Sequence, residues 1–263
     1  MKIATFNVNS IRSRMDALRV WTAAHQPDLL CIQETKATDQ DFPKLEVEAL
    51  GYAAVFRGEP KYNGVAILHR RPPDEVRFGF DDGGPADETR LLAARWGRWT
   101  VVNTYVPQGR EITHAMYRYK LEWYARLRRW FEQHAKPTEP VVWVGDLNVA
   151  ATPDDVHSPD KYEDHVCYHR DVRAAFADCR AWGFEDLFRR FHPEPGRYSF
   201  FDYRTPLAVD RNIGWRLDYI LATPPAARVA RMCDIDLAPR KSERPSDHTV
   251  VYADFDDSPG AAG

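Results

Sequence analysis

With 263 residues, 44% of them hydrophobic and 13% aromatic, the chain has a globular composition and can bury a large core. It contains no run of about 18 apolar residues, and its start lacks the apolar segment of a signal peptide, so neither a membrane span nor a cleaved leader is expected. The formal net charge of −3 neither indicates nor excludes a nucleic-acid-binding protein, because binding depends on where the charges cluster.

Short apolar runs rich in Val, Ile, Leu and aromatic residues predict the strands. In chain order they lie at 2–8, 28–34, 64–70, 91–96, 99–106, 141–149, 216–223 and 249–255. Two of these runs are separated only by Gly97-Arg98, which predicts a hairpin with a Gly-first two-residue turn.

Apolar residues at helical spacing predict helices at 13–26, 114–134 and 171–183, between the strands. The third helix is expected to open on Asp171 as its capping residue and to stop at Gly183. Hairpins mixed with helices favour mixed or antiparallel sheets over a strictly alternating parallel fold. Two packed sheets with helices outside would bury this many strands.

The domain prediction is one α/β catalytic unit spanning residues 1–256, because no Gly/Ser-rich or Pro-rich linker divides the sequence. The last segment, 257–263, has no apolar period and is expected to be a disordered tail. The four cysteines are scattered and form no Cys-x-x-Cys pair. Reduced thiols in a cytoplasmic protein fit this pattern best.

Polar side chains stand inside, at the end of or just beyond several of the apolar runs. They are Asn7 and Asn9, Glu34 and Lys36, Tyr105 and Gln108, Asp146 and Asn148, Asp218, and Asp247 with His248. Strand residues two apart point to the same face, so Asp146 and Asn148 are expected to point the same way. Because charged groups beside buried strands are costly unless they are paired or bind a metal, we expect the strands to deliver this set to one pocket.

The residue types in this set select a chemistry. Oxygen ligands without cysteine suit a hard cation such as Mg²⁺ or Mn²⁺, which commonly handles phosphate oxygens. An Asp beside a His indicates an oriented imidazole, a further Asp can activate a water, and Tyr, Asn and Gln can donate to a phosphoryl group. Each residue alone has an ordinary structural explanation, such as a turn, a cap or an ion pair. Together they indicate metal-assisted phosphodiester hydrolysis, without naming the substrate.

Longer motifs narrow this class. The segments are "FNVNSIRSR", "PDLLCIQETK", "GVAIL", "NTYVPQG", "VGDLNVA", "YSFFDYR", "GWRLDYIL" and "PSDH", and they span about residues 1 to 256. In these segments, and in their order, the chain resembles the exonuclease III family of abasic-site endonucleases, within the endonuclease/exonuclease/phosphatase superfamily. "GDLN" or "SDH" alone would mark only the superfamily, whereas "QETK", "GDLNVA" and "GWRLDYIL" together point to its DNA-repair branch.

The resemblance implies a four-layered α/β sandwich like that of deoxyribonuclease I, with the site at one edge of two packed sheets. It implies that Glu34 is the main Mg²⁺ ligand, that Asn7 lies beside it, and that Asp247 supports the same ion. Asp146 would position and deprotonate the attacking water, and Asn148 would hold Asp146 or the phosphate. Whether Asp146 and Asn148 also hold a second metal stays open.

Three further catalytic roles follow from the same resemblance. His248 would contact the scissile phosphate, and Asp218 would fix its tautomer and orientation. Tyr105 would bind the phosphate or stabilise the leaving oxygen. Water would then attack the phosphorus 5′ of an abasic residue in line and leave a 3′-hydroxyl. Activity as a 3′–5′ exodeoxyribonuclease and in trimming 3′ ends is also implied.

The expected partner is double-stranded DNA with abasic sites or 3′ ends, bound by a monomer. In the family, a flipped-out abasic sugar occupies an apolar pocket, and the corresponding positions are Phe200, Trp215 and Leu217. These three could instead be core residues. Candidate contacts to the substrate strand are Asn9, Lys36, Gln108 and Arg110, with Arg12 and Arg14 equally explained as a solvated helix face.

The segment 151–170 departs from the family pattern, because it contains His157, His165, Cys167 and His169. A polar loop is the main interpretation and a zinc site the minor one, since this spacing is not usual for structural zinc.

Three other functions compete with the nuclease. A lipid phosphodiesterase or an RNA deadenylase of the same superfamily would share the catalytic acids but not "QETK" or "GWRLDYIL". A non-enzymatic nucleic-acid-binding regulator on this fold would lack the acids that this chain retains. A purely structural interaction domain would leave the clustered acids unexplained.

Overall fold

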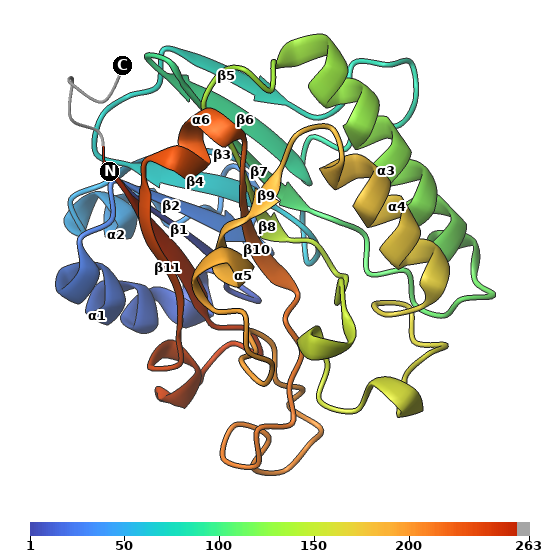
Figure 1. Cartoon of the computed structure of the whole chain (residues 1–263). Coiled ribbons are helices and arrows are strands. Elements are labelled where there is room, and N and C mark those ends of the chain that lie inside the picture. Colours follow the sequence, from blue (N-terminus) through green and yellow to red (C-terminus); the bar gives the residue numbers. More distant parts are fainter. Residues whose placement is uncertain (257–263) are drawn as a thin grey trace.

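The computed structural model describes residues 1–256, and the predicted tail lies outside them. Two six-stranded sheets pack face to face, with helices on both outer faces (Figure 1). The strand order of the first sheet is β11 (Ala230–Asp236), β12 (Val250–Phe255), β1 (Lys2–Asn7), β2 (Leu29–Gln33), β4 (Val65–His69) and β3 (Ala53–Arg57). That of the second is β5 (Glu75–Phe78), β6 (Leu91–Trp96), β7 (Trp99–Tyr105), β8 (Val141–Asp146), β10 (Asp218–Ala222) and β9 (Glu185–Asp186). This arrangement confirms the predicted four-layered sandwich.

The helices cover the sheets from outside. They are α1 (Met15–His25), α2 (Lys44–Ala49), α3 (Ala115–His134), α4 (Arg170–Arg180), α5 (Leu187–Phe191) and α6 (Pro224–Arg228), with short 3₁₀ turns at Arg12–Arg14, Pro153–Asp155, Pro159–Lys161 and Pro239–Lys241. Helices α1 and α2 pack on the first sheet, and α3 and α4 pack on the second (Figure 1). Within residues 1–256, every helix is too short or too polar to cross a bilayer.

Each sheet is built around one parallel pair of strands, and all its other pairings are antiparallel. The parallel pairs are β1 with β2 and β7 with β8. Helix α1 connects the first pair and α3 connects the second, as parallel strands require a crossover. The carboxyl ends of parallel strands are where α/β proteins place their ligands, so this topology creates two such ends in one molecule.

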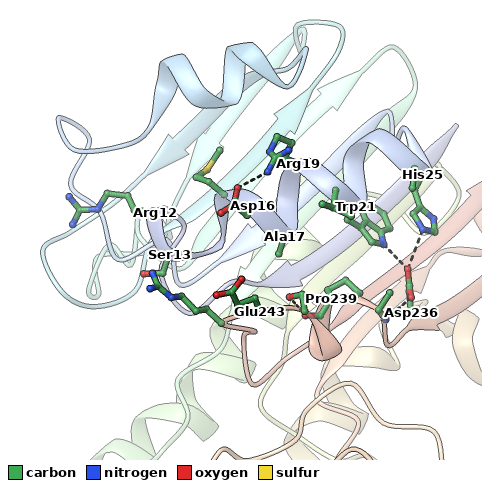
Figure 2. A pocket seen from close by; sticks show the side chains of 16 residues that line it. Arg12, Ser13, Asp16, Ala17, Arg19, Trp21, His25, Asp236, Pro239 and Glu243 are labelled. Carbon is green, nitrogen blue, oxygen red and sulfur yellow. Dashed lines mark hydrogen bonds and ion pairs between the residues drawn. The ribbon is translucent and has the colours of Figure 1, made fainter.

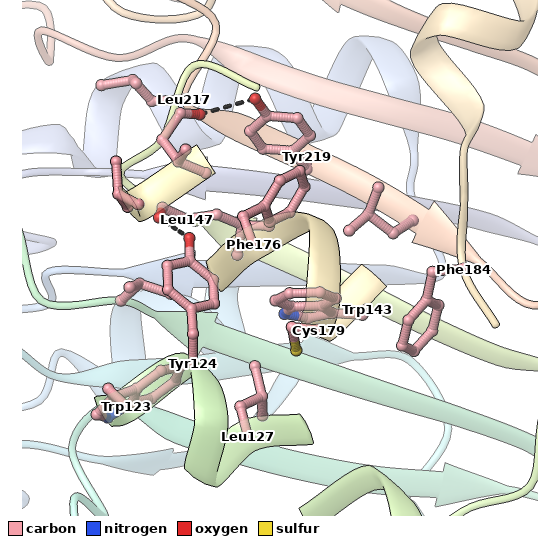
Figure 3. Close-up of a cluster of buried hydrophobic side chains, with 14 of the residues drawn as sticks. Trp123, Tyr124, Leu127, Trp143, Leu147, Phe176, Cys179, Phe184, Leu217 and Tyr219 are labelled. Atoms are coloured by element: carbon pink, nitrogen blue, oxygen red, sulfur yellow. Dashed lines mark hydrogen bonds between the residues drawn. The ribbon is translucent and has the colours of Figure 1, made fainter. Parts of the chain in front are cut away.

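Three apolar layers hold the sandwich together. The middle layer lies between the sheets and includes Ile3, Ile67, Val101, Val142 and Ile220. The layer under α3 and α4 is rich in aromatic side chains, among them Trp123, Trp143, Phe176, Phe184 and Tyr219 (Figure 3). Tyr124 of this layer donates a hydrogen bond to the carbonyl of Leu147, just beyond the end of β8 (Figure 3). The aromatic helix face thus contacts the chain where a strand leaves the core.

A buried group of amides crosses from one sheet to the other. Gln33 donates to Asn103 Oδ1 at 2.6 Å and to Thr5 Oγ1 at 2.9 Å. Asn103 in turn donates to the carbonyls of Ile32 and Ala66 at 3.0 and 2.9 Å. All of these side chains are fully buried. Because unpaired buried amides are costly, the group fixes the lateral position of one sheet on the other.

The eight predicted strands are present, and the hairpin at Gly97-Arg98 is confirmed by the pairing of Trp96 with Trp99. Strands β3, β5, β9 and β11 were not predicted. β9 has two residues, and the apolar residues of β11 are interrupted by Arg231, Asp234 and Asp236, so its apolar runs are too short to indicate a strand. The predicted cap at Asp171 was wrong: α4 begins at Arg170, and the side chain of His169 accepts a hydrogen bond from the Asp171 amide.

Candidate active site

The carboxyl ends of the two parallel strand pairs meet at one edge of the sandwich. In the first sheet, β1 ends at Asn7 and Glu34 directly follows β2. In the second sheet, β7 ends at Tyr105 and β8 ends at Asp146, and these two residues are register partners. The antiparallel strand β10 begins at Asp218, opposite Asp146. Acids from two sheets are therefore brought together by topology alone.

His248, just before β12, lies between two buried carboxylates. Its Nδ1 is 2.8 Å from Asp218 Oδ2, and its Nε2 is 3.6 Å from Asp146 Oδ2. Ser199 donates to the same Asp218 oxygen at 2.6 Å and fixes that carboxylate. The order Asp218–His248–Asp146 leaves Nε2 facing the pocket beside Asp146, as an orienting carboxylate behind a functional imidazole would.

Burial and charge set the protonation of this group. Burial by itself would lower the pKa of His248, but the carboxylates of Asp218 and Asp146 outweigh it and raise that pKa to about 10. Burial raises the pKa of Asp146 to about 7, against the opposing charge of His248. The site therefore holds a cationic imidazole beside a carboxyl group that titrates near neutral pH.

Asn7 connects the acids of the two sheets. Its Nδ2 donates to Glu34 Oε1 and to Asp146 Oδ2, each at 2.8 Å, while its Oδ1 accepts from the amide of Asn9 at 3.0 Å. The oxygen of Asn7 therefore points away from the carboxylates. The predicted ligand role of Asn7 would require its amide to rotate.

Lys36 and Asn9 form a polar ring outside this bridge. Lys36 lies 2.9 Å from Glu34 Oε2 and also donates to Asn9 Oδ1. Asn9 donates to Asp247 Oδ1 at 3.0 Å. Burial would raise the pKa of Glu34, but Lys36, with the Asn7 hydrogen bond and the charge of His248, outweighs it and keeps the pKa below its ordinary value. Lys36 and Asn9 thus position the acids rather than line the pocket itself.

Asn148 reaches Asp146 through a turn rather than through strand alternation. Strand β8 ends at Asp146, and Asn148 adopts a left-handed backbone with φ of 50°. Its backbone amide donates to Asp146 Oδ1 at 3.0 Å, and its Nδ2 donates to the carbonyl of Val106 at 2.9 Å. The thiol of Cys167 lies 3.7 Å from Asn148 Oδ1. Asp146 and Asn148 therefore lie together as predicted. The predicted reason, alternation along one strand, was wrong, because Asn148 lies beyond the end of β8.

A pocket of about 460 Å³ opens directly on these groups. Its acidic side contains Glu34, Asp146, Asn148, Asp247 and His248, and its apolar side contains Phe200, Trp215 and Leu217. The rings of Phe200 and His248 lie 4.9 Å apart. Tyr105 also lines the pocket, and burial raises the pKa of its hydroxyl, as do Glu34 and Asp146, so it stays a neutral donor.

The loop that contains His157, His165 and Cys167 forms another wall of this pocket. His165 lies 4.6 Å from the ring of Trp215, and its Nδ1 accepts from the amide of Cys167 at 3.1 Å. Burial lowers the pKa of His165 to about 4. His169 lies elsewhere, 2.8 Å from the hydroxyl of Tyr117. The loop is thus part of the pocket wall, which the polar-loop interpretation did not anticipate.

The predicted DNA contacts are distributed unevenly. Gln108 lines the pocket, and its side chain accepts a hydrogen bond from the backbone amide of Arg110 at 2.7 Å. The side chain of Arg110 is exposed and lies outside the pocket. Arg14 donates to the hydroxyl of Tyr203 at 3.0 Å. Arg12 lies instead in a separate groove of about 600 Å³ between α1 and the turn at Pro239–Lys241 (Figure 2), which shares no lining residue with the pocket.

The donor set fits a hard cation. Within residues 1–256, Asp146, Asp218 and His248 form a group of potential metal ligands whose ligand atoms all lie within 4.8 Å of one another. Oδ1 of Asp218 is buried without a hydrogen-bond partner. Glu34 lies on the same acidic side of the pocket, joined to Asp146 by the single amide of Asn7. Mostly oxygen ligands of high negative charge are what Mg²⁺ and Mn²⁺ prefer.

Two buried residues of the site were missed from the sequence. Ser199, which holds Asp218, gave no signal beyond its place in "YSFFDYR". Lys120 lies behind Asn148, and its place on the aromatic face of a predicted helix is the signal that could have identified it. Arg126 is also buried on that helix and pairs with Asp82 and Asp87.

The chain is similar to known nucleases over nearly its whole length. Residues 4–248 match the endonuclease/exonuclease/phosphatase family. Exodeoxyribonuclease III of Haemophilus influenzae is 32% identical, over 97% of this chain and 100% of that protein. An AP endonuclease from Archaeoglobus fulgidus has a TM-score of 0.95 and 46% identity, over 97% of this chain and 99% of that one. The 3′ phosphatase NExo from Neisseria, bound to a product DNA hairpin, has a TM-score of 0.91 and 34% identity, with the same coverage.

Proposed function

The chain belongs to the endonuclease/exonuclease/phosphatase family, and from this premise we propose that it is a metal-dependent DNA repair nuclease that hydrolyses the phosphodiester 5′ of abasic sites. The observation that carries the proposal is the Asp218–His248–Asp146 group at the acidic end of a pocket whose other side is apolar. An exodeoxyribonuclease III and an AP endonuclease, both similar over 97% of the chain, support the same reaction class.

Asp146 acts as the base in this proposal. Because its pKa is near 7, Asp146 is a stronger base than an ordinary carboxylate and can accept a proton from water at neutral pH. The water oxygen bonds to phosphorus in line with the leaving 3′-oxygen, whose bond to phosphorus breaks. The products are a 3′-hydroxyl on one strand end and a 5′-phosphate that carries the abasic sugar.

His248, Asn148 and Tyr105 stabilise the phosphate. The imidazolium of His248 presents a fixed positive charge through Nε2, because Asp218 occupies Nδ1. Tyr105 and Asn148 line the same pocket with neutral donors. Preorganised donors of this kind are most effective where negative charge grows in the transition state.

Glu34, supported by Asp247, would hold the cation, for which we propose Mg²⁺, with Mn²⁺ as a substitute, and Asp146 is a candidate ligand of a second metal. When bound, such a cation neutralises phosphate charge and stabilises the leaving oxygen. Asn148 and Asn7 are further candidate ligands, Asn7 after rotation of its amide.

The apolar side of the pocket selects the substrate. Phe200, Trp215 and Leu217 form a slot beside the catalytic group. A sugar without a base fits such a slot after flipping out of the duplex, whereas a normal nucleotide overfills it and must also break its stacking and pairing. We propose contacts to the DNA backbone from Lys36, Gln108 and Arg110, with Asn9 positioning Lys36.

The same site would process 3′ ends, as a 3′–5′ exonuclease and as a 3′-end-trimming enzyme. A 3′ phosphatase, NExo, is among the similar structures, and the proposed chemistry needs only a phosphorus placed between Asp146 and His248. We further propose that the protein acts as a monomer in the cytoplasm.

The test is a labelled duplex with a single tetrahydrofuran abasic analogue, incubated with and without Mg²⁺ beside an undamaged duplex with a recessed 3′ end. We expect Mg²⁺-dependent incision 5′ of the analogue, and slower shortening of the recessed end. Intact abasic duplex in the presence of Mg²⁺ or Mn²⁺ would refute the proposal.

A further inference from the structure

A charged side chain lies buried behind one wall of the pocket. Lys120, in the second turn of α3, is fully buried on the helix face that includes Trp123, Tyr124 and Leu127. Its Nζ forms no ion pair with a carboxylate within residues 1–256; its oxygen partners there are three backbone carbonyls. An ammonium removed from water at such cost requires strong compensation, so this position calls for an explanation beyond packing.

The three carbonyls belong to three separate segments of the pocket wall. Lys120 Nζ donates to the carbonyl of Gln108 at 3.0 Å, of Asn148 at 2.6 Å and of Val166 at 2.7 Å. The first segment follows β7, the second follows β8, and the third precedes Cys167 in the loop between β8 and α4. The side chains of Gln108, Asn148 and Cys167 all line the pocket. One cation therefore ties together the chain beneath three pocket-lining residues.

Burial lowers the pKa of Lys120, but the three carbonyl acceptors around its Nζ favour the charged form. A neutral amine has two N–H groups, whereas three carbonyl oxygens lie within hydrogen-bond distance, and only an ammonium has three protons to donate. The chain at Gly109 also passes close over the lysine stem, since a Cβ added there would lie 3.4 Å from Lys120 Cδ. The site is thus closed around the lysine on all sides and is not accessible to a ligand.

The carbonyl of Asn148 is the contact with the most direct consequence. This residue has a left-handed backbone, which asparagine adopts more readily than most residues, and its carbonyl accepts the short hydrogen bond from Lys120. The amide of Asn148 is then fixed at both ends, with Nδ2 donating to Val106 and Oδ1 facing the thiol of Cys167. Its backbone N–H is left directed at Asp146.

We propose that Lys120 is a positioning residue for the phosphodiesterase reaction, which it supports by holding the Gln108, Asn148 and Cys167 segments in register around Asp146. The inference rests on the proposed function, since it assigns Lys120 a role in that reaction. Lys120 touches neither substrate nor reacting atoms. It acts through the backbone of Asn148 and through the segments on either side of it.

The same helix offers a matched control. Tyr124, one turn further along α3, is also buried, and its hydroxyl donates to the carbonyl of Leu147, the residue before Asn148. Tyr124→Phe removes one buried hydrogen bond to this region without removing a charge or freeing the pocket segments. Lys120→Met removes three hydrogen bonds and the charge while keeping the volume of the stem. A purely structural role predicts that both variants lose stability and that neither loses turnover once folded.

The experiment compares wild type, Lys120→Met, Lys120→Arg and Tyr124→Phe. Each is assayed in Mg²⁺ on the abasic duplex, well below its own melting temperature, with binding of the same duplex measured in EDTA. Because small displacements of reacting groups are costly, we expect Lys120→Met to lower kcat by on the order of tenfold to 100-fold. We expect its KM and duplex Kd to stay within about threefold of wild type, and Tyr124→Phe to keep kcat within about twofold. Lys120→Arg, which keeps the charge, should retain more turnover than Lys120→Met.

A Lys120→Met enzyme whose kcat equals that of Tyr124→Phe would overturn the inference. Wild type that fails to cut the abasic duplex would instead refute the proposed function. If Lys120→Met does not fold, wild type with ¹⁵N-labelled lysine decides the question. We expect one ammonium signal that exchanges slowly with water and shifts when product duplex is added. A signal unmoved by bound product would show that Lys120 is structural only.

Discussion

The charge of one buried pair decides what this site can do. Asp146 and His248 lie 3.6 Å apart, and each sets the protonation of the other. Burial raises the pKa of Asp146 to about 7, while Asp218 and Asp146 together overcome burial and raise that of His248 to about 10. Between these values the pair combines a base with a cation, which are the two charges that phosphodiester hydrolysis needs.

Replacing Asp146 by Asn should remove the base and leave the fold. The amide keeps the shape of the carboxyl group but accepts no proton, so we expect kcat to fall by about 100-fold to 10,000-fold while abasic-duplex affinity in EDTA changes little. Single-turnover cleavage and a binding titration measure the two effects. The exposed Asp160→Asn, in the nearby loop, is the control. Near-normal cleavage by Asp146→Asn would show that another group accepts the proton.

The pH profile should have two limbs. Activity is expected to fall as pH drops through the pKa of Asp146, near 7 before a bound cation lowers it, because the protonated carboxyl cannot accept a proton. It should fall again as pH rises through the pKa of His248 near 10, because the neutral imidazole no longer stabilises the phosphate. The measurement is kcat/KM on the tetrahydrofuran duplex over a pH range that extends beyond both pKa values. Asp218→Asn should move the alkaline limb to lower pH, and an unmoved limb would contradict the role given to Asp218.

At the scale of elements, two parallel strand pairs are what build the site. Their carboxyl ends place Asn7 and Glu34 from one sheet opposite Tyr105 and Asp146 from the other. The position of these ends depends on how the sheets are aligned. The buried amides of Gln33 and Asn103 fix that alignment just inside the site.

Much of this could be predicted from the sequence, because strands buried on both faces give long apolar runs whose ends are visible. The acids at those ends were therefore found, and the motifs placed them in one pocket. The backbone turns were not predicted. The left-handed conformations at Glu34 and Lys36 have no signature in residue type, and the one at Asn148 was overlooked although asparagine is enriched in that region. Nor was Lys120, since a lysine is read as a surface residue unless the helical period is followed strictly. The loop containing His165 was ambiguous, because polar residues can line a pocket as readily as a surface.

Asn103→Ala tests the connection between the sheets. It removes one acceptor from the buried amide of Gln33, which keeps its hydrogen bond to Thr5, and it takes the Asn103 donor from two buried carbonyls. Each buried group left unsatisfied costs about 1–3 kcal/mol. We expect the free energy of unfolding to drop by at least the lower end of that range, measured by urea titration. Thr100→Ala, on the same strand but half-exposed, should cost less. Equal losses in the two variants would argue against a special role for the amides.

At the scale of the whole molecule, a net charge of −3 must be reconciled with a polyanionic substrate. The acids are concentrated in the catalytic group, where a cation would offset them, while Lys36 and Arg110 lie around it and Arg204 lines the same pocket. Partner choice therefore follows the local pattern of charge rather than its sum.

Added salt should therefore lower the affinity of the enzyme for DNA. Each phosphate that is neutralised contributes about −0.9 to the slope of log affinity against log salt. We expect kcat/KM to fall steeply between 50 and 200 mM salt, the range over which such contacts are lost. Arg110→Ala should reduce the slope by about one unit. A flat salt profile would argue against a DNA track on this surface.

The most direct test of the central claim is cleavage of the abasic duplex in H₂¹⁸O with Mg²⁺, followed by mass spectrometry of both fragments. The proposed attack of water on phosphorus places one ¹⁸O in the 5′-phosphate that carries the abasic analogue and leaves an unlabelled 3′-hydroxyl on the other fragment. A cut without ¹⁸O in that phosphate, or a label on the 3′ fragment, would contradict it.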